Sequence, residues 1–253
     1  MSAWLQGRVI ENRFWTETLF SLRVRLGTGA PPLAFEAGQF VRIALDLEVG
    51  NAGSRVARPF SFVNPPADPV LEFYGVIVPG GPLSPALARL KAGDALYVAD
   101  NPSGFLVLAE VPPADDLWLV ATGTGIAPFL SILRTATPWQ RYRRVILVHA
   151  ARRASELVYR DLILELQSAH KAFSCVSFVS REAHPGSLAG RIPEAIRDGR
   201  LEAAARPISA ERSQFMLCGN PDMLKDAGAA LAARGLRKNR RRTPGQITVE
   251  SFW

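Results

Sequence analysis

The spacing of hydrophobic residues changes once along the chain, and this change limits the possible folds more than any other feature of the sequence. Up to about residue 110, short runs rich in β-branched and aromatic residues are separated by Gly, Pro or Asp, a pattern typical of β-strands. The six runs cover residues 7–15, 19–26, 38–45, 58–65, 71–78 and 94–100. Six short strands in succession predict an antiparallel β-barrel or sandwich.

One helix is expected to interrupt the strands of this first half. Leu83, Leu87 and Leu90 recur at helical spacing. Ser84 is expected to be the N-cap residue, with Pro85 in the first helical position, where no amide hydrogen is needed.

In the second half, apolar runs typical of buried strands alternate with helical patterns. Strands are expected at 117–123, 143–152, 174–182 and the start of 213–236, and helices at 126–136, 155–169, within 190–204 and at the end of 213–236. This alternation predicts a parallel, Rossmann-like sheet with helices on both faces. Paired prolines and acids at 110–116 break both patterns, so we predict a barrel domain over 1–110 and an α/β domain over 111–253.

Composition indicates the compartment of the protein and whether a metal site is expected. The chain has no apolar run that could span a bilayer, and its first residues lack the basic and apolar segments of a signal peptide. Two cysteines cannot form a disulfide framework or a four-thiolate cluster, which favours the cytoplasm. His149, His170 and His184 lack metal-ligand spacing, so no metal site is expected.

The positive charge of the chain is concentrated in its second half. Residues 1–112 contain 9 basic and 10 acidic side chains, and residues 113–253 contain 21 and 13, which together give the net charge of +7. A basic second half favours an anionic ligand or partner, although an arginine-rich solvated surface would have the same composition.

The segment ATGTGIAPFLS, residues 121–131, follows a predicted strand and leads into a helix, the context in which backbone NH groups bind phosphate. Gly123 and Gly125 have the spacing of a dinucleotide loop. Pro128 replaces the third glycine, so the close helix–strand packing of that glycine is expected to be missing. No acid follows at the distance that a ribose 2′-hydroxyl requires, whereas arginines, which suit a 2′-phosphate, are plentiful. On these residues alone, a nucleotide loop and an ordinary turn both stay open.

An ordered series of motifs extends over the whole chain. WLQGRV, LAFEAGQF, RPFSF, LEFY, LSP, LWLVATGT, LVHAAR, VSRE, GSLAGRIP, MLCGNP and the ending ESFW follow one another. Each motif is common, but the ordered set resembles the ferredoxin–NADP(+) reductase family, and within it the bacterial flavodoxin/ferredoxin branch. The resemblance implies an FAD-binding barrel, an NADP(H)-binding α/β domain, a C-terminal tail that returns to FAD, and a monomer. It also implies electron transfer between NADPH and an acidic carrier, ferredoxin or flavodoxin.

The resemblance assigns FAD contacts to the barrel, to the opening loop and to the chain end. Arg58 would bind the pyrophosphate through its planar donor fork. Phe60, which stands where the family has tyrosine, would stack on the isoalloxazine ring, and Ser61 would lie near flavin N5. The expected FAD contacts are Arg58, Pro59, Phe60, Ser61, Tyr74, Pro82, Leu83, Ser84, Thr124, Phe252 and Trp253.

The resemblance assigns NADP(H) contacts to residues that end or follow the parallel strands. Three arginines among them would bind the 2′-phosphate and favour NADPH over NADH. The expected NADP(H) contacts are Ala151, Arg152, Ser180, Arg181, Arg191, Cys218, Gly219 and Asn220. Ser61, Cys218 and Glu250 are expected around the contact between nicotinamide and flavin, with Glu250 in proton transfer. Catalysis would then consist mostly of aligning the two rings.

Two alternative functions stay open from the sequence. A stand-alone NAD(P)H-flavin reductase component that feeds an oxygenase would have the same fold, although such proteins often carry clustered iron–sulfur cysteines that this chain lacks. The basic run 235–245, GLRKNRRRTPG, could bind nucleic acid. It lacks interleaved aromatic residues, and a solvated face or a docking patch for an acidic carrier explains it equally well. Neither a nucleic acid nor a membrane is therefore expected as a partner.

Overall fold

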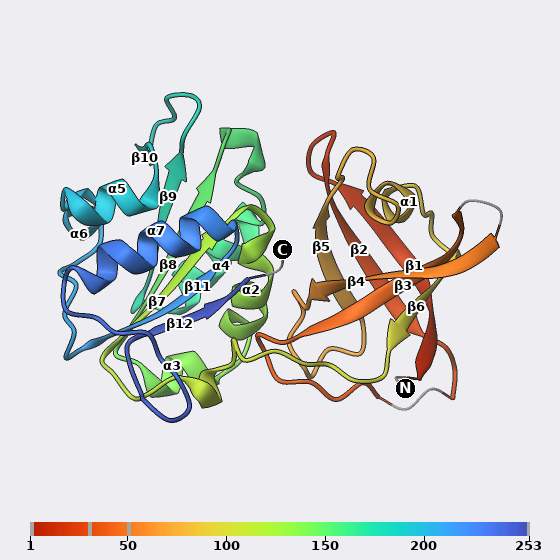
Figure 1. Cartoon of the computed structure of the whole chain (residues 1–253), viewed down its shortest axis with the longest axis horizontal. Coiled ribbons are helices and arrows are strands. Elements are labelled where there is room, and N and C mark those ends of the chain that lie inside the picture. The colour runs from red at the N-terminus through yellow and green to blue at the C-terminus, as the bar shows by residue number, and fades with distance from the viewer. Residues whose placement is uncertain (1–2, 30–31, 50–51, 252–253) are drawn as a thin grey trace.

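The computed structural model describes residues 3–29, 32–49 and 52–251 and contains two sheets built from separate parts of the chain. The sheets lie beside each other, the first drawn in red to yellow and the second in green to blue (Figure 1). The first sheet ends at Ala99 and the second begins at Asp116, so the domain boundary at 110/111 falls between them and stays a prediction. No α-helix in the described part of the chain has the length and apolarity that crossing a bilayer requires.

The first sheet is antiparallel and curls into a half-barrel with the strand order β4-β3-β6-β1-β2-β5. Its strands are β1 Trp4–Phe14, β2 Leu19–Leu26, β3 Phe40–Val49, β4 Ala52–Ser61, β5 Leu71–Val76 and β6 Ala95–Ala99. The edge strands β4 and β5 approach each other where Phe62 forms an isolated antiparallel bridge with Phe73. All six predicted strands are confirmed. In β2 the alternation of strand side chains buries Leu22 and Val24 and leaves Arg23 exposed.

Helix α1, Ser84–Ala88, lies between β5 and β6 as predicted, but the predicted N-cap is wrong. Leu83 occupies the N-cap position, and Ser84 is the first helical residue. The Ser84 hydroxyl accepts a hydrogen bond from the backbone NH of Val78, with 2.9 Å between Oγ and N. Leu83 is buried in the barrel core, and this packing fixes the start of the helix.

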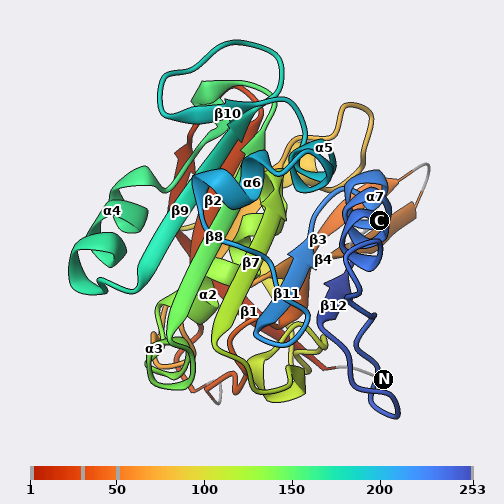
Figure 2. The ribbon, with the colours of Figure 1, turned by 90° about the vertical axis from the view of Figure 1, so that its left-hand side faces the viewer.

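The second sheet is parallel throughout, with the order β10-β9-β8-β7-β11-β12. Its strands are β7 Asp116–Thr122, β8 Arg144–Ala151, β9 Phe173–Val179, β10 Ser187–Ala189, β11 Ser213–Cys218 and β12 Ile247–Glu250. The helices are α2 Ala127–Leu133, α3 Thr137–Arg141, α4 Arg160–Ala169, α5 Ile192–Arg197, α6 Arg200–Ala204 and α7 Pro221–Ala232. Helices α4 and α7 lie to either side of the strands in Figure 2 and pack in different hydrophobic cores, one on each face of the sheet, which confirms the predicted layers.

Both faces of the sheet are apolar because each packs on helices. Leu117 and Leu119 of β7 belong to the core that contains residues of α2 and α4, whereas Trp118 packs in the core that contains α5, α6 and α7. Helix α2 lies on the side of the sheet that faces the barrel (Figure 1). The core around α2 also includes Leu19 and Tyr74 of the barrel, so one hydrophobic core continues from one sheet into the other.

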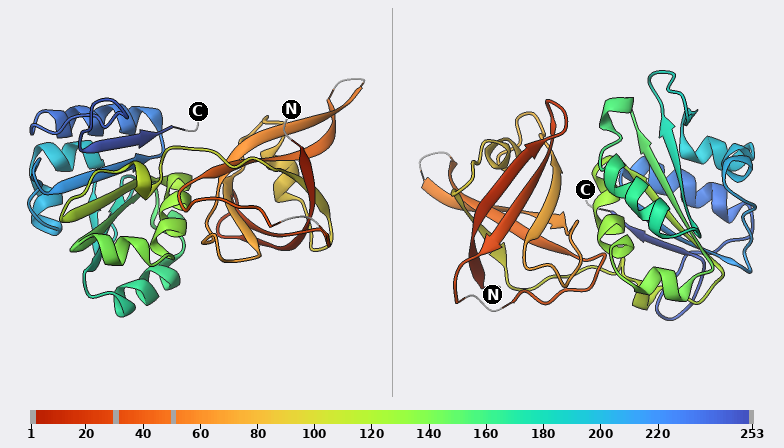
Figure 3. Two further views of the ribbon diagram at one scale, coloured as in Figure 1. Left: turned by 90° about the horizontal axis from the view of Figure 1, so that it is seen from below. Right: turned by 180° about the vertical axis from the view of Figure 1, so that it is seen from behind.

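Four α-helices and strands of the second half differ from the sequence-based expectation, and one of them is helix α3, which was not predicted. The helix expected from Ser155 begins only at Arg160, because Tyr159 takes a left-handed backbone conformation with φ 58°. Ser155 lies in a short 3-10 helix, η3, Ala154–Glu156. Strands β10 and β12 were not predicted. Strand β12 pairs with β11, and it points toward the barrel (Figure 3).

Candidate active site

A cleft with a volume of about 570 Å³ lies where the parallel sheet meets the barrel. Strand β7 has β8 on one side and β11 on the other, so the strand order reverses at β7, the position at which open α/β sheets bind ligands. Thr18, Leu19 and Val76 border the cleft from the barrel side. The cleft brings together eight of the predicted nucleotide contacts, which are Thr124, Ala151, Arg152, Ser180, Arg181, Arg191, Gly219 and Asn220.

Two glycines allow the loops after β7 and β11 to approach each other beside this cleft. A Cβ atom on Gly125 would collide with the carbonyl group of Cys218 and would lie 2.8 Å from Cα of Gly219. Gly219 has a φ of 137°, and a Cβ atom there would lie 2.8 Å from the carbonyl oxygen of Thr122. The loop therefore does contain a glycine that is packed closely on a strand end, but it is Gly125, which packs against the end of β11. Pro128 lies in the first turn of α2, where no amide hydrogen is needed.

Asn220 joins the same two loops by hydrogen bonds. Its backbone NH donates to Oγ1 of Thr122 over 2.9 Å. Its side-chain oxygen accepts from the backbone NH groups of Asp222 at 2.9 Å and Met223 at 3.3 Å, which makes Asn220 the N-cap of α7. The predicted contact of Asn220 with a nucleotide stays a prediction, and the capping function is compatible with it.

Three arginines at the cleft have no acidic partner among the residues that the structure describes. Arg152, Arg181 and Arg191 are exposed and line the cleft, and none of the ion pairs within the described ranges involves them. The neighbouring Arg153 differs, since its guanidinium lies 3.7 Å from Glu182. Unpaired cations at the rim of a cleft attract anions, so this wall suits a phosphorylated ligand.

Two hydroxyl groups of the barrel are buried without a hydrogen-bond partner among the described residues. Ser61 at the end of β4 is 6% exposed, and Tyr74 in β5 is 3% exposed. Burial raises the pKa of Tyr74, so its phenol keeps its proton and can donate. Buried polar groups are rarely left unpaired in proteins, and these two hydroxyls suit a ligand that offers acceptor atoms.

The other expected FAD contacts are distributed along the barrel. Arg58 is exposed and donates to the carbonyl oxygen of Ala57 over 2.8 Å, and it takes part in no ion pair within the described residues. Phe60, two residues further along β4, is half-buried on the same face of the strand. Pro59 is half-buried and Pro82 is exposed, and these placements do not test a ligand contact. Phe252 and Trp253 lie outside the described residues.

Cys218 does not line the cleft. The residue is fully buried, and burial together with the charge of Glu250 raises the pKa of the thiol well above its ordinary value. A thiol that does not ionise is not a nucleophile. Gly219 and Asn220, which follow it, do reach the cleft.

Glu250 lies beside Cys218 in the register of β11 and β12 and reaches the connection between the sheets. One carboxyl oxygen accepts a hydrogen bond from the backbone NH of Phe105 over 3.1 Å. The other oxygen is buried and has no partner within the described chain. Burial raises the pKa of Glu250 to about 7, so its carboxyl can hold or release a proton near neutral pH.

Sequence reasoning missed two groups of cleft residues, the barrel residues that form one wall and the acidic residues of the parallel-sheet half. The barrel residues are ordinary members of apolar strands and their turns, and no sequence signal marks them. Glu156 follows two arginines and accepts hydrogen bonds from their backbone NH groups, which a capping pattern could have indicated. The cleft residues that were missed include Thr18, Leu19, Val76, Glu156, Asp222 and Asp226.

A curled antiparallel sheet, a parallel sheet and a cleft at its switch point define a two-domain oxidoreductase of the dinucleotide-binding class. The family model described as the oxidoreductase NAD-binding domain matches residues 119–228, which contain the end of β7, the loop after it and strands β8 to β11.

Full-length relatives identify the family more closely. The flavodoxin/ferredoxin–NADP reductase of Escherichia coli (strain K12) is 45% identical and is matched over 100% of both chains. The ferredoxin–NADP reductase of Pseudomonas aeruginosa is 36% identical over 96% of this chain and 95% of its own. A crystal structure of a ferredoxin NADP+ reductase from Neisseria gonorrhoeae with bound FAD and NADP is similar with a TM-score of 0.90, at 32% identity over 99% of each chain. The chain belongs to the flavodoxin/ferredoxin–NADP reductase family.

Proposed function

We propose that this chain is an FAD-dependent flavodoxin/ferredoxin–NADP(+) reductase, with an FAD domain over residues 1–110 and an NADP(H) domain over residues 111–253. The observation that carries the proposal is the cleft, because residues of both sheets border it at the switch point of the parallel sheet. A reaction between two nucleotide cofactors requires a site of this kind, in which each domain contributes one wall.

The barrel residues fit FAD. The buried hydroxyls of Ser61 and Tyr74 lack partners among the described residues, and a flavin ring presents nitrogen and oxygen acceptors to such groups. Arg58 has no acidic partner in the described chain and would bind the pyrophosphate, while Phe60 would pack on the ring. When bound, FAD accepts two electrons from NADPH as a hydride and releases them singly to a carrier.

The parallel-sheet residues fit NADP(H). Arg152, Arg181 and Arg191 line the cleft and form no ion pair within the described part of the chain. Guanidinium groups bind a 2′-phosphate, which NADPH has and NADH lacks. Glu250 would hold a proton on its unpartnered oxygen at the junction of the domains. The protein's part in the reaction is then to align the nicotinamide and the flavin and to exclude water from between them.

The partner and the compartment belong to the same proposal. The names of the relatives imply that the partner is an electron-carrier protein. The excess of positive charge in residues 113–253 suits an acidic ferredoxin or flavodoxin. Both cysteines are free thiols, which suits the reducing cytoplasm. We propose a monomer, as the resemblance implies.

An anaerobic titration of the purified, FAD-loaded protein tests the proposal. NADPH should bleach the flavin absorbance rapidly, and NADH should require much higher concentrations. Replacing Arg152 or Arg181 with Ala should raise the KM for NADPH about 10–100-fold, because each change removes a charge-assisted hydrogen bond to phosphate. The KM for NADH should change little.

Arg153→Ala is the matched control for this experiment. Arg153 is adjacent in sequence but pairs with Glu182, so its loss should leave the KM for NADPH nearly unchanged. An equal response of the wild-type protein to NADPH and NADH would contradict the function of the arginines. If the purified protein contains no flavin and does not bind added FAD, the proposed function as a whole is contradicted.

A further inference from the structure

Tyr159 has an unusual backbone conformation. Within residues 3–29, 32–49 and 52–251 it is the only residue other than glycine with a positive φ, at 58°. A bulky side chain is strained in the left-handed region, and strain of this kind persists only where the surroundings impose it. The contacts of the Tyr159 side chain explain what imposes it.

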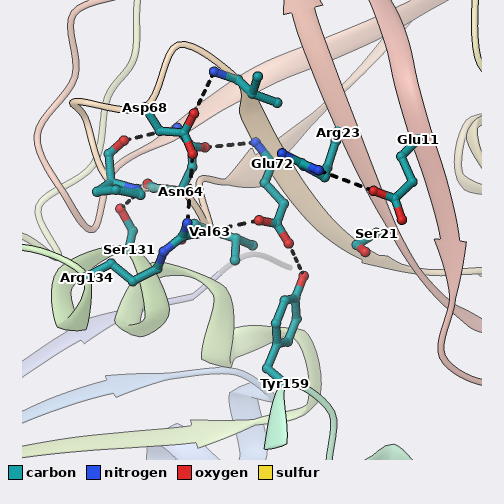
Figure 4. Close-up of polar contacts among 12 residues, drawn as sticks. Glu11, Ser21, Arg23, Val63, Asn64, Asp68, Glu72, Ser131, Arg134 and Tyr159 are labelled. Carbon is teal, nitrogen blue, oxygen red and sulfur yellow. Dashed lines mark hydrogen bonds and ion pairs between the residues drawn. The ribbon is translucent and has the colours of Figure 1, made fainter. Parts of the chain in front are cut away.

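The side chain of Tyr159 contacts residues of the barrel. Its hydroxyl donates a hydrogen bond to a carboxyl oxygen of Glu72 in β5 over 2.9 Å (Figure 4). The ring lies 4.6 Å from that of Trp15 and meets the ring of Tyr74 edge-on at 5.5 Å. Tyr159 is 6% exposed, so these contacts are shielded from water.

Glu72 is held in place from a second direction. Its other carboxyl oxygen lies 3.5 Å from the guanidinium of Arg134, at the end of α2. Its backbone NH donates to the side chain of Asn64 over 2.8 Å, and the hydroxyl of Ser131 donates to the carbonyl oxygen of Asn64 over 2.7 Å. Figure 4 shows these residues bridging the two domains. The carboxylate therefore has a fixed position when Tyr159 binds it.

Both residues of this hydrogen bond lie in segments that also contain residues of the cleft wall. On the barrel side, Glu72, Tyr74 and Val76 lie on one face of β5, and Val76 borders the cleft. On the other side, the turn from Arg152 to Val158 is closed by hydrogen bonds of Glu156 and Leu157. Arg152 and Glu156 line the cleft, and Tyr159 ends this turn. The Tyr159–Glu72 hydrogen bond thus joins the two walls of the cleft, beside the contacts of Arg134 and Ser131 that also link the two halves.

We propose that Tyr159 is a positioning residue whose hydrogen bond to Glu72 sets the separation of the two walls of the nucleotide cleft. This inference rests on the proposed function. A ligand that contacts both walls, such as NADP+, should depend on the hydrogen bond. A ligand that contacts only the arginine wall should not.

Equilibrium binding to the FAD-loaded protein tests the proposal without turnover. Isothermal titration calorimetry would compare NADP+ with 2′,5′-ADP, which carries the 2′-phosphate but lacks the nicotinamide half. Tyr159→Phe removes only the hydroxyl, and it should weaken NADP+ binding about 3–10-fold and leave 2′,5′-ADP binding unchanged. Glu72→Ala, which also removes the ion pair with Arg134, should weaken NADP+ binding at least as much. Glu72→Gln keeps an acceptor for the hydroxyl and should restore most of the affinity for NADP+.

Tyr142→Phe is the matched control, since the Tyr142 hydroxyl is also buried in the parallel-sheet domain but has no partner in the described chain. It should change neither affinity. Equal weakening of both ligands by Tyr159→Phe, or no weakening of NADP+, would overturn the positioning role. Failure of the wild-type protein to bind either nucleotide would instead overturn the proposed function.

Discussion

At the scale of single residues, Glu250 couples folding to pH. Burial raises its pKa from the ordinary 4.5 to about 7, so the folded protein holds this proton more tightly than the unfolded chain does. Below the lower value both states are protonated and Glu250 has no effect on stability. Between the two values the unfolded chain ionises first, so the free energy of unfolding falls as the pH rises through this window. Above the window the loss is complete.

We predict that Glu250→Gln removes this loss. Glutamine keeps an acceptor for the NH of Phe105 but does not ionise. The stability of the variant relative to wild type should therefore increase by roughly 1–3 kcal/mol between pH 5 and pH 8. Urea unfolding of FAD-saturated protein at both pH values measures the difference. Glu17→Gln, at an exposed site, is the control, and the same pH dependence in both variants would contradict the assignment.

At the scale of elements, the site depends on how closely the ends of β7 and β11 approach each other. Gly125 and Gly219 leave no room for a side chain between the two loops, whereas Gly228 within α7 has no atom within 4 Å of an added Cβ. The two kinds of glycine should therefore respond oppositely to the same substitution, although both changes add a single methyl group.

We predict that Gly125→Ala lowers the free energy of unfolding by roughly 1–3 kcal/mol, because the backbone of β11 must shift. Gly228→Ala should raise it by roughly 0.5–1 kcal/mol, because alanine favours the helix and meets no neighbour. Denaturant titration measures both changes. A stabilising Gly125→Ala would show that the loops are not in contact in solution.

The sequence was most informative where structure depends on local pattern. The strand runs of the barrel and the strand–helix alternation were visible because each burial pattern repeats within one element. Strand β12, Ile247–Glu250, was not visible, because it is short and its partner β11 lies far away in the chain. The late start of α4 was also hidden. The helical pattern continues through Tyr159, and only its contacts with Glu72 and Trp15 impose the left-handed turn.

The candidate site divides in the same way. Arg152 and Arg181 could be placed from sequence because they follow predicted parallel strands, whose carboxyl ends meet at one edge of a sheet. Arg191 follows strand β10, which was not predicted, so its assignment rested on the family resemblance. Leu19 and Val76 could not, because an apolar residue that borders a cleft looks like any other strand residue. The unpaired state of the Ser61 and Tyr74 hydroxyls depends on the packing of both domains, which no local pattern records.

At the scale of the whole molecule, charge is distributed unevenly. The basic run 235–245 belongs to the second half, and its charged part, residues 237–242, lies near the junction. There Arg241 pairs with Glu110 at 2.9 Å and lies over the ring of Phe105 at 4.3 Å. Arg240 and Arg242 are exposed, and neither takes part in an ion pair within the described chain. Their charges are free to attract an acidic carrier protein.

We predict that the double variant Arg240→Glu/Arg242→Glu raises the KM for ferredoxin or flavodoxin about tenfold and weakens its dependence on ionic strength, because surface charges steer association. Steady-state assays with the carrier at two salt concentrations measure both effects. NADPH oxidation with a neutral quinone as acceptor should be unchanged. Arg25→Glu on the barrel strand β2 is the control, and an equal rise in KM for this variant would contradict a docking surface at 237–242.

The hydrophobic core that continues from the barrel into the parallel sheet has a consequence for divergence among relatives. Leu19 and Tyr74 of one half pack with Phe129 and Leu130 of the other, so neither half can change its packing face alone. A chimaera that joins the barrel of one relative to the sheet of another would bring together side chains that never adapted to each other. A substitution on one side of this seam therefore changes the packing of the other side as well.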